Sequence, residues 1–396
     1  MKVTFVSNYI NHHQIPLAEE LYGILGEEYR FIETEKMEEE RIRMGWDADT
    51  GALPYLLQYY KEPEVCRALI ADSDVVVFGG TDDESYIADR LREHKPVIRC
   101  SERLYKEGQW KAVSPRGLRR KYLDHTRYRN QSVYLLCAGA YVPSDFHIVR
   151  AYPKKMFRWG YFPPFIEQDL KLLMEKKREN VCPRILWSGR FLDWKHPEEA
   201  LALAAFLKRE QIPFQLTMIG GGEREKQLKM QLEQEGLTDV VSMPGFLKPQ
   251  EVREAMEQAD IFLLTSDYKE GWGAVLNEAM NSGCAVVANA AAGAAPYLIR
   301  HGKNGFLYQN RNREELSAHV KYLLLQSDVR EKMGKKAYET IAGTWNAKKA
   351  GDALLLLCRQ ALGEEGIVLP ESGPGSRAPV IAQRSMYRIA VKRSQL

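Results

Sequence analysis

The chain has 396 residues, of which 45% are apolar and 28% are charged, the composition of an ordinary globular protein. This length exceeds that of one typical core, so two domains are expected. The 56 Lys and Arg residues nearly balance the 53 Asp and Glu residues, and a net charge of +3 argues against a dedicated nucleic-acid-binding protein. No apolar run approaches the ~18 residues of a membrane-spanning helix. We therefore expect a cytoplasmic protein.

Short apolar runs alternate with longer helical patterns along the whole chain. In the first half the runs predict strands at 3–7, 30–32, 75–78, 97–100 and 133–137. In the second half they predict strands at 185–188, 214–219, 240–243, 261–264, 285–288 and 305–308. The runs lack the polar alternation of half-exposed strands and are typical of parallel strands buried on both faces. The sequence therefore predicts an α/β protein with parallel, doubly wound sheets.

The strand–helix series stops near Pro163-Pro164 and restarts at Ile185 after a charged stretch. We predict an N-terminal domain, a linker, a C-terminal domain, a helix that can cross back to the N-terminal domain, and a basic tail, with the bounds 1–165, 166–180, 181–345, 346–365 and 366–396. Doubly wound domains bind ligands at the carboxyl ends of their strands. Functional residues are therefore expected in the loops that follow strands.

The most informative loop follows the predicted strand at 261–264. Its Gly271 and Gly273 open a helix, whose free N–H groups and positive dipole end suit a diphosphate. Glu270 precedes the glycines, and Glu278 lies about 7.5 Å along the helix axis beyond Gly273. Carboxylates accept paired hydrogen bonds from vicinal hydroxyls, so both could hold sugars. The spacing alone also fits a purely structural interpretation, in which Glu270 is a loop carboxylate and Glu278 a solvated carboxylate on the helix.

The segment from Glu270 to Met280 resembles the Glu-x7-Glu motif of the retaining GT-B glycosyltransferases, closest to the large family called GT4. The stretches 283–288 and 302–307, with Gly293 between them, are also similar to that family. The resemblance is strong over roughly 180–345 and architectural over 1–165. It implies two Rossmann-like domains facing across a deep cleft. It also implies transfer of a hexosyl group from a nucleoside-diphosphate sugar to an acceptor hydroxyl, with no metal and no cofactor.

The same resemblance assigns roles to individual residues. Three residues would be catalytic. Glu270 would hold the donor sugar, and Arg190 and Lys195, just past the strand at 185–188, would stabilise the leaving diphosphate. Glu278 would hold the ribose, and Phe246 would flank the base. The predicted donor-binding set is Glu278, Gly271, Trp272, Gly273, Gly189, Phe246 and Leu247. The turn Gly220-Gly221-Gly222 would provide backbone clearance.

The N-terminal domain matches the family less well, because it lacks the glycine-rich turn after its first strand. Acceptor or cleft contacts are assigned to polar residues that follow two strands: Asn11, His12, His13, Gln14, Ser101, Glu102 and Arg103. A structural turn and a metal-binding histidine pair are the alternatives for the first group. The strings Asp47-Ala48-Asp49 and Asp72-Ser73-Asp74 have the form of a metal-binding motif, and we interpret both as chance.

A basic stretch with interleaved tyrosines lies within 116–129. It is either a solvated surface, a contact with anionic lipid at the inner membrane face, or a contact with an acidic acceptor. The expected partners are a nucleotide-sugar donor and a carbohydrate, glycolipid or small-molecule acceptor, in a setting such as polysaccharide biosynthesis. The alternatives for function are a nucleotide-sugar epimerase or hydrolase of the same fold and a catalytically silent nucleotide-sugar-binding protein.

Overall fold

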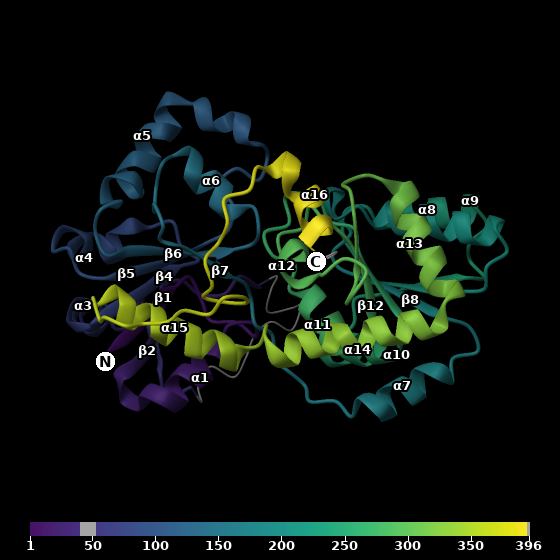
Figure 1. Ribbon diagram of the computed structural model, residues 1–396, viewed down its shortest axis with the longest axis horizontal. Coiled ribbons are helices and arrows are strands. Elements are labelled where there is room, and N and C mark those ends of the chain that lie inside the picture. The colour runs from purple at the N-terminus through teal and green to yellow at the C-terminus, as the bar shows by residue number, and fades with distance from the viewer. Residues whose placement is uncertain (40–52, 394–396) are drawn as a thin grey trace. The chain divides into compact units, whose positions relative to one another are not determined.

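The computed structural model describes residues 1–39 and 53–393, and the chain divides into two compact units (Figure 1). Unit 1 comprises Met1–Pro164 and Trp345–Gln383, and unit 2 comprises Phe165–Thr344 and the residues from Arg384 onward. All six cysteines are free thiols. No helix in the described ranges is both long enough and apolar enough to cross a membrane.

The described residues of unit 1 form a seven-stranded parallel sheet in the order β3-β2-β1-β4-β5-β6-β7. The strands are β1 (Val3–Ser7), β2 (Tyr29–Glu33), β3 (Leu56–Gln58), β4 (Val75–Gly79), β5 (Val97–Ser101), β6 (Val133–Ala138) and β7 (Met156–Trp159). β1 and β4 are buried at every position. This burial explains why their sequences are continuously apolar rather than alternating.

Helices cover both faces of this sheet. One face packs in a single core with α3 (Pro63–Asp72), α4 (Ala88–Arg92) and α6 (Val142–Ile148). On the other face α1 (Ile15–Leu25) packs against α15 (Ala347–Ala361), as Figure 1 shows. A further helix, α5 (Pro115–Asp124), contributes no buried residue. The helix predicted at 346–365 therefore contributes to the same unit as the first helix of the chain.

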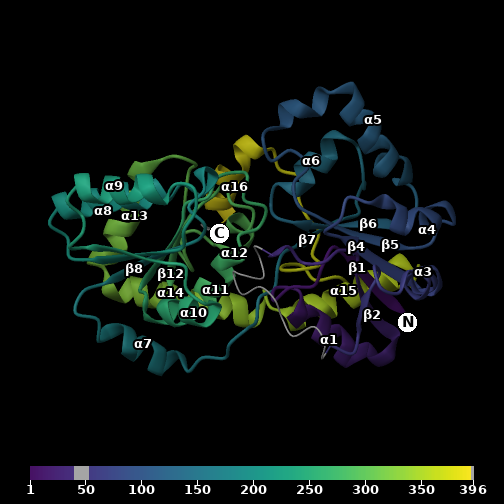
Figure 2. The same ribbon diagram turned by 180° about the vertical axis from the view of Figure 1, so that it is seen from behind.

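The described residues of unit 2 form a six-stranded parallel sheet in the order β10-β9-β8-β11-β12-β13. The strands are β8 (Arg184–Ser188), β9 (Gln215–Ile219), β10 (Val241–Gly245), β11 (Ile261–Leu264), β12 (Ala285–Asn289) and β13 (Phe306–Tyr308). One face is covered by α8 (Pro197–Arg209), α9 (Glu225–Gln234) and α13 (Arg313–Leu325), as Figure 2 shows. Helices α10 (Pro249–Gln258), α11 (Val275–Asn281) and α14 (Ser327–Gly343) lie on the other.

The structure adds elements that the sequence patterns did not predict. β3 and β7 are the two edge strands of the unit 1 sheet, and both are short. The stretch predicted as a linker contains α7 (Leu170–Arg178). Its Leu173 and Met174 are buried in unit 2, so this stretch is part of that unit rather than a free connection. Only these two apolar residues of α7 are buried, and the many charged residues around them led the sequence analysis to predict a linker instead of a helix.

Part of the predicted basic tail is built into unit 1. Residues 375–378 run antiparallel beside β7, where the Arg158 amide donates to the Ser376 carbonyl over 2.8 Å and the Ala378 amide donates to the Met156 carbonyl over 3.0 Å. An exposed edge strand is a template for aggregation, and these residues cover it. Beyond them, α16 (Gln383–Arg393) follows.

Candidate functional site

Two loops of unit 2 meet at the carboxyl edge of its sheet. They follow β8 and β11, which are hydrogen-bonded neighbours although two strands separate them in sequence. β9 and β10 lie to one side of this pair, and β12 and β13 lie to the other. The direction of winding reverses here, and doubly wound sheets bind ligands at such a point.

Hydrogen bonds to main-chain carbonyl groups join the two loops. The Thr265 hydroxyl donates to the Lys195 carbonyl oxygen over 2.6 Å, and the Asp267 amide donates to the Trp194 carbonyl oxygen over 2.9 Å. The indole N–H of Trp187, on β8, donates to the Thr265 hydroxyl over 2.8 Å. Thr265 is therefore held from both sides and fixes where the chain around Lys195 lies.

Lys195 and Glu270 face each other at this junction. The Lys195 Nζ and a Glu270 carboxylate oxygen form an ion pair, and the two side chains are 16% and 10% exposed. A cation suits the oxygens of a diphosphate, and a carboxylate suits sugar hydroxyls. The structure thus brings together two of the three residues for which catalytic roles are predicted. The third, Arg190, is exposed, and its side chain has no partner within the described ranges.

The glycine loop before α11 contains a residue in a backbone conformation that favours glycine. Gly273 has a φ of 93°, a left-handed conformation that L side chains rarely adopt. A Cβ there would also lie 3.3 Å from the Glu270 Cγ. The amides of Gly271 and Gly273 donate to no group in the described part of the chain, so they are available to an anion.

Glu278 lies on α11 with its side chain half-buried. Within the described residues no group donates a hydrogen bond to its carboxylate. Burial raises the pKa of Glu278, an effect that the charge of Arg253 partly opposes. Glu278 is therefore a carboxylate that the fold partly desolvates without satisfying, an arrangement suited to a ligand hydroxyl.

Trp272 does not expose its ring. The indole is 1% exposed and donates through Nε1 to the Asn277 side chain over 2.9 Å. The ring therefore packs inside unit 2, and a ligand contact through the indole, as expected for a residue of the donor-binding set, is not available in this structure. The apolar bulk of tryptophan is accommodated by the core beneath the loop.

A second glycine turn approaches the β8 loop closely. Gly220 has a φ of 133°, and a Cβ on it would lie 1.9 Å from the Gly189 carbonyl oxygen. Beside it, a Cβ on Gly221 would lie 2.6 Å from the ring of Phe246, which is 61% exposed. Phe246 therefore presents an open aromatic face over a glycine backbone, with Leu247 half-buried next to it. This geometry fits the predicted role of Phe246 as a flank for a planar base.

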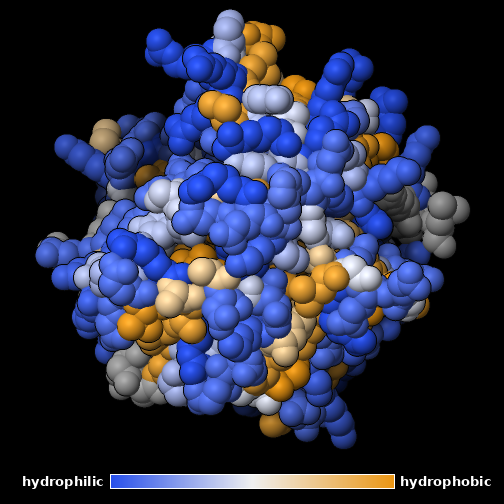
Figure 3. Space-filling model, turned by 90° about the vertical axis from the view of Figure 1, so that its left-hand side faces the viewer, coloured by the Kyte–Doolittle hydropathy of each residue, from blue (hydrophilic) through white to orange (hydrophobic). Residues whose placement is uncertain are grey.

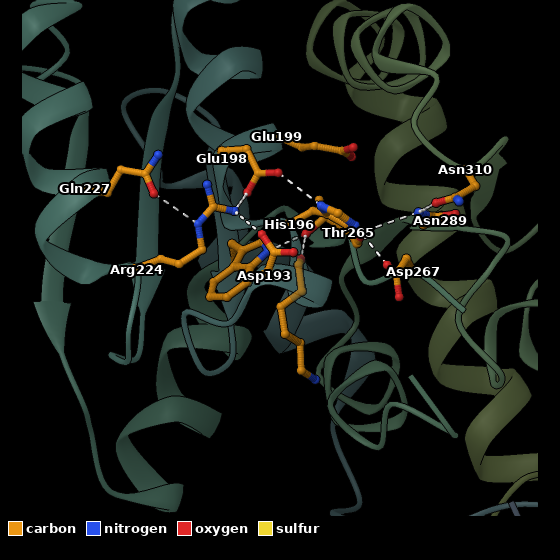
Figure 4. Close-up of polar contacts among 12 residues, drawn as sticks. Asp193, His196, Glu198, Glu199, Arg224, Gln227, Thr265, Asp267, Asn289 and Asn310 are labelled. Atoms are coloured by element: carbon orange, nitrogen blue, oxygen red, sulfur yellow. Dashed lines mark hydrogen bonds and ion pairs between the residues drawn. The ribbon is translucent and has the colours of Figure 1, made fainter. Parts of the chain in front are cut away.

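The residue after Lys195 is a site component that sequence reasoning missed. His196 places its imidazole between the carboxylates of Glu198 and Asp267, with ring nitrogen to oxygen distances of 3.0 and 3.2 Å (Figure 4). Both contacts raise the pKa of His196 to about 9, the Asp267 hydrogen bond most, despite burial. A polar Thr265-Ser266-Asp267 run directly after an apolar strand was the available signal.

In unit 1 the predicted acceptor residues form a compact turn after β1. The amides of Gln14 and Ile15 donate to the Asn11 carbonyl, and the Asn11 side chain accepts from the His13 amide over 2.9 Å. The rings of His12 and His13 have centroids 3.8 Å apart. Burial lowers the pKa of both histidines, so both rings are neutral at pH 7.

The loop after β5 meets this turn through Tyr161, which sequence reasoning did not single out. Its hydroxyl donates to a Glu102 carboxylate oxygen over 2.6 Å, and its ring stacks with His13 at a centroid distance of 6.3 Å. The Ser101 hydroxyl donates to the carbonyl of Glu102. His13, Glu102 and Tyr161 therefore form one polar group at the carboxyl edge of the unit 1 sheet.

Arg103 does not belong to that group. Its side chain is 1% exposed and forms a two-point ion pair with Asp145, which is fully buried. Asp145 also accepts from the Tyr105 amide and the Gln109 side chain, so the pair is part of the core. The prediction of Arg103 as a cleft residue is corrected, because the chain turns inward directly after Glu102.

The two Asp-x-Asp strings do not join a metal site in the described ranges. Asp47 and Asp49 lie outside the described residues. Asp72 pairs with Lys2 at 2.6 Å, and Asp74 accepts from the Lys2 amide, at the edge of the sheet where β4 begins. No group of three or more His, Cys, Asp or Glu side chains suited to a metal ion occurs in residues 1–39 and 53–393.

The fold defines a protein of two Rossmann-like units, and the candidate ligand site lies in the second. Residues 173–340 match the family model described as Glycosyl transferases group 1. The matched residues lie within unit 2. Two solved structures share the fold over most of the chain, and with them the architecture is GT-B. HepE of Anabaena in complex with UDP and glucose is 14% identical, with a TM-score of 0.61, covering 91% of this chain and 98% of that one. A glycosyltransferase from Rickettsia africae is 15% identical, with a TM-score of 0.65, covering 92% and 99%.

Curated relatives match over part of the chain. The amylovoran biosynthesis glycosyltransferase AmsK of Erwinia amylovora is 34% identical over 140 residues, which is 34% of each chain. The alpha-D-kanosaminyltransferase of Streptomyces kanamyceticus is 28% identical over 178 residues, 45% of this chain and 46% of that one. The matched region therefore covers less than half the length of each of these two relatives.

Proposed function

We propose that this protein is a retaining glycosyltransferase that moves a hexosyl group from a nucleoside-diphosphate sugar to an acceptor hydroxyl without a metal ion. The observation that carries the proposal is the Lys195–Glu270 pair at the point of unit 2 where the winding reverses. It combines a cation for a leaving diphosphate with a carboxylate for a sugar. The group 1 family match over 173–340 covers both residues and supports the same activity.

Each neighbouring feature has a place in this proposal. The diphosphate would lie against Lys195 and Arg190, beside the free amides of Gly271 and Gly273. Glu270 would hold the donor sugar, Glu278 the ribose and Phe246 the base. The acceptor hydroxyl would attack the anomeric carbon of the donor sugar on the same face from which the diphosphate departs. The departing phosphate would take the proton of that hydroxyl. The polar group of His13, Glu102 and Tyr161 in unit 1 would contact the acceptor, for which carbohydrates and glycolipids are the proposed classes.

The donor is identified by the thermal stability of the whole chain with UDP, GDP, ADP, TDP and CMP sugars, each in the presence of EDTA. A ligand at about 100 times its dissociation constant adds about 2.7 kcal/mol of stability. A shift with one diphosphate family supports the proposal, and a shift that needs a divalent ion contradicts metal independence.

NMR of the product's anomeric centre then separates retention from inversion. Epimerisation or hydrolysis of the donor would instead favour the alternative enzyme classes, and binding without any product would favour a silent binding protein.

Replacing Glu278 by alanine is expected to weaken donor binding about 10- to 100-fold, because a charge-assisted hydrogen bond contributes about 1.5–3 kcal/mol. The melting temperature of the free protein should stay equal or rise, since the raised pKa of Glu278 means that its ionised form opposes folding at neutral pH. Isothermal titration with the donor and a melting curve without it measure the two effects.

The matched control for this variant is Glu233→Ala, which removes an exposed carboxylate from α9. It should change neither donor affinity nor stability measurably. Equal affinity of the Glu278→Ala and wild-type proteins would show that Glu278 does not hold the ribose.

We also propose that unit 1 touches anionic lipid through α5 and the turn before it. This segment exposes large apolar side chains, with Trp110 70% exposed, Val113 78% and Tyr122 55%. The same stretch of chain carries the exposed cations Arg116, Arg119, Arg120, Arg127 and Arg129. Near the top of Figure 3, at the height of α5, hydrophobic side chains stand among strongly hydrophilic ones. Apolar side chains bordered by arginines suit the interface of an anionic bilayer.

Removing two of these cations should lower the partitioning of the protein onto vesicles about 30-fold, since each contributes about 1 kcal/mol near an anionic surface. The test compares Arg116→Ala/Arg119→Ala with wild type by sedimentation with phosphatidylglycerol-containing vesicles. Lys226→Ala/Lys303→Ala, which removes two exposed cations of unit 2, is the control. Equal binding of wild type to neutral phosphatidylcholine vesicles would refute an electrostatic contact, as would equal binding of the two double variants.

A further inference from the structure

His196 has a backbone conformation that histidine seldom adopts. Its φ and ψ are 48° and 51°, in the left-handed region, which is unfavourable for a residue with a Cβ. It lies between the 3-10 helix η6 (Asp193–Lys195) and Pro197, the first residue of α8. Glycine would be the unstrained choice there. The side chain therefore offsets a backbone cost, and its contacts show how.

Both ring nitrogens of His196 meet carboxylates from different elements. One contacts Glu198 on α8 at 3.0 Å, and the other contacts Asp267 in the loop after β11 at 3.2 Å. Figure 4 shows the ring between these two side chains. Both carboxylates are fixed in turn, since Arg224 donates to Glu198 over 2.5 Å and the Lys269 amide donates to Asp267 over 2.8 Å. The imidazole therefore spans two rigid anchors.

Two carboxylate acceptors require two donors, which only the imidazolium form of histidine supplies. The other charged groups near the ring are Glu199, which the Tyr308 hydroxyl contacts over 2.9 Å, and the Arg224–Asp193 pair at 3.5 Å. Glu199 adds negative charge, and Arg224 opposes Glu198. The balance favours the cation, in agreement with the raised pKa of His196.

His196 and its two carboxylate contacts also connect the loop that carries Lys195 with the loop that carries Glu270. His196 follows Lys195 directly, and Asp267 begins the turn that leads to Glu270, whose amide donates to the Asp267 carbonyl over 3.1 Å. The contacts of Thr265 and of the Asp267 amide reach main-chain carbonyl groups of the loop after β8, and the His196–Asp267 contact adds a tie between side chains of the two loops. We propose that the His196 imidazolium is a positioning residue, which clamps the loop after β8 to the loop after β11 and so sets Lys195 against Glu270.

The clamp can be measured without any ligand. The pKa of His196 is about 9 in the folded protein, against 6.5 ordinarily. Its stabilisation is thus fully present below pH 6.5 and is lost as the pH rises through 9. We compare wild type with His196→Asn, because asparagine tolerates the left-handed backbone but cannot supply a cation. The wild type should melt higher at pH 6.5, and the difference should disappear by pH 10.

His94→Asn is the matched control, since His94 is also left-handed, with a φ of 59°, but is exposed in unit 1. Its melting temperature should follow that of wild type at every pH. A His196→Asn difference that persists unchanged to pH 10 would overturn the clamp, as would the absence of any difference at pH 6.5. His196→Gly, which relieves the backbone, provides a second variant should asparagine not fold.

The effect on catalysis rests on the proposed function and is measured separately. With the donor identified by the thermal screen, His196→Asn should lower kcat about 10-fold and change donor Kd less than about threefold, because small displacements of catalytic groups act mainly on the transition state. The wild-type kcat should fall toward that of the variant above pH 9. An unchanged kcat in a variant with the expected melting behaviour would overturn the positioning role. A wild type that binds no nucleotide sugar would instead refute the proposed function, and the melting experiment would still decide whether the clamp exists.

Discussion

Replacing Lys195 by alanine is expected to lower kcat for sugar transfer about 100- to 1000-fold, the usual cost of removing one group that stabilises charge in a transition state. The Lys195 Nζ is the cation paired with Glu270 at the junction of the two loops. Negative charge grows on the leaving diphosphate as the glycosidic bond breaks, so the loss should appear in kcat more than in KM. Steady-state kinetics with the donor from the thermal screen measures both constants.

The control for Lys195→Ala is Lys208→Ala, which removes a lysine from an exposed pair with Asp239. Exposed ion pairs contribute little to stability, and Lys208 lies on α8 rather than in either loop of the candidate site. The kcat of Lys208→Ala should therefore equal that of wild type. Glu270→Ala and the double variant Lys195→Ala/Glu270→Ala complete a double-mutant cycle. If the two residues act as a unit, the loss of kcat in the double variant should be smaller than the sum of the losses in the two single variants, expressed as free energies. A Lys195→Ala enzyme with wild-type kcat would remove the main support for the proposed mechanism.

Replacing Asp145 by alanine is expected to destabilise the protein by about 3–5 kcal/mol, the effect of breaking a buried ion pair on one side. Asp145 is fully buried and accepts from two nitrogens of Arg103, from the Tyr105 amide and from the Gln109 side chain. The variant leaves a buried guanidinium without its counter-charge and an amide without its acceptor. Urea unfolding followed by circular dichroism measures the change.

Asp72→Ala serves as the control, because Asp72 pairs with Lys2 while their side chains are 68% and 51% exposed. Its free energy of unfolding should stay within about 0.5 kcal/mol of wild type. Comparable unfolding curves for the two aspartate variants would mean that the Arg103–Asp145 pair does not support the core of unit 1.

The sequence was most informative where strands are buried on both faces. β11 and β12 are buried at every position, and the continuous apolar runs at 261–264 and 285–288 predicted them directly. The same holds for the glycine loop, because a left-handed Gly273 and a crowded Gly220 admit no other residue without strain. In these places one local requirement decides the residue type, so the pattern can be read without the fold.

The sequence was least informative where a role depends on a distant neighbour. β7 has only four residues, one of them the half-buried Arg158, and its pairing partners include Arg377 near the end of the chain. Arg103 follows a strand, as a site residue would, yet its burial depends on Asp145 in helix α6. His196 is defined by Asp267, which is 71 positions away. Nothing in the local sequence of Arg103 or His196 encodes those partners.

Unit 1 is assembled from two separated stretches of chain, and this has a consequence for how the protein is made. The segment Trp345–Gln383 includes α15, whose Ala353, Leu354 and Leu357 are buried. On the ribosome, the Phe165–Thr344 part of unit 2 emerges before this segment does. Nascent chains fold domain by domain as they appear. The first 164 residues must therefore wait, with the surface for α15 uncovered, while residues Phe165–Thr344 are synthesised. We expect this surface to be the part of the nascent chain most prone to aggregate.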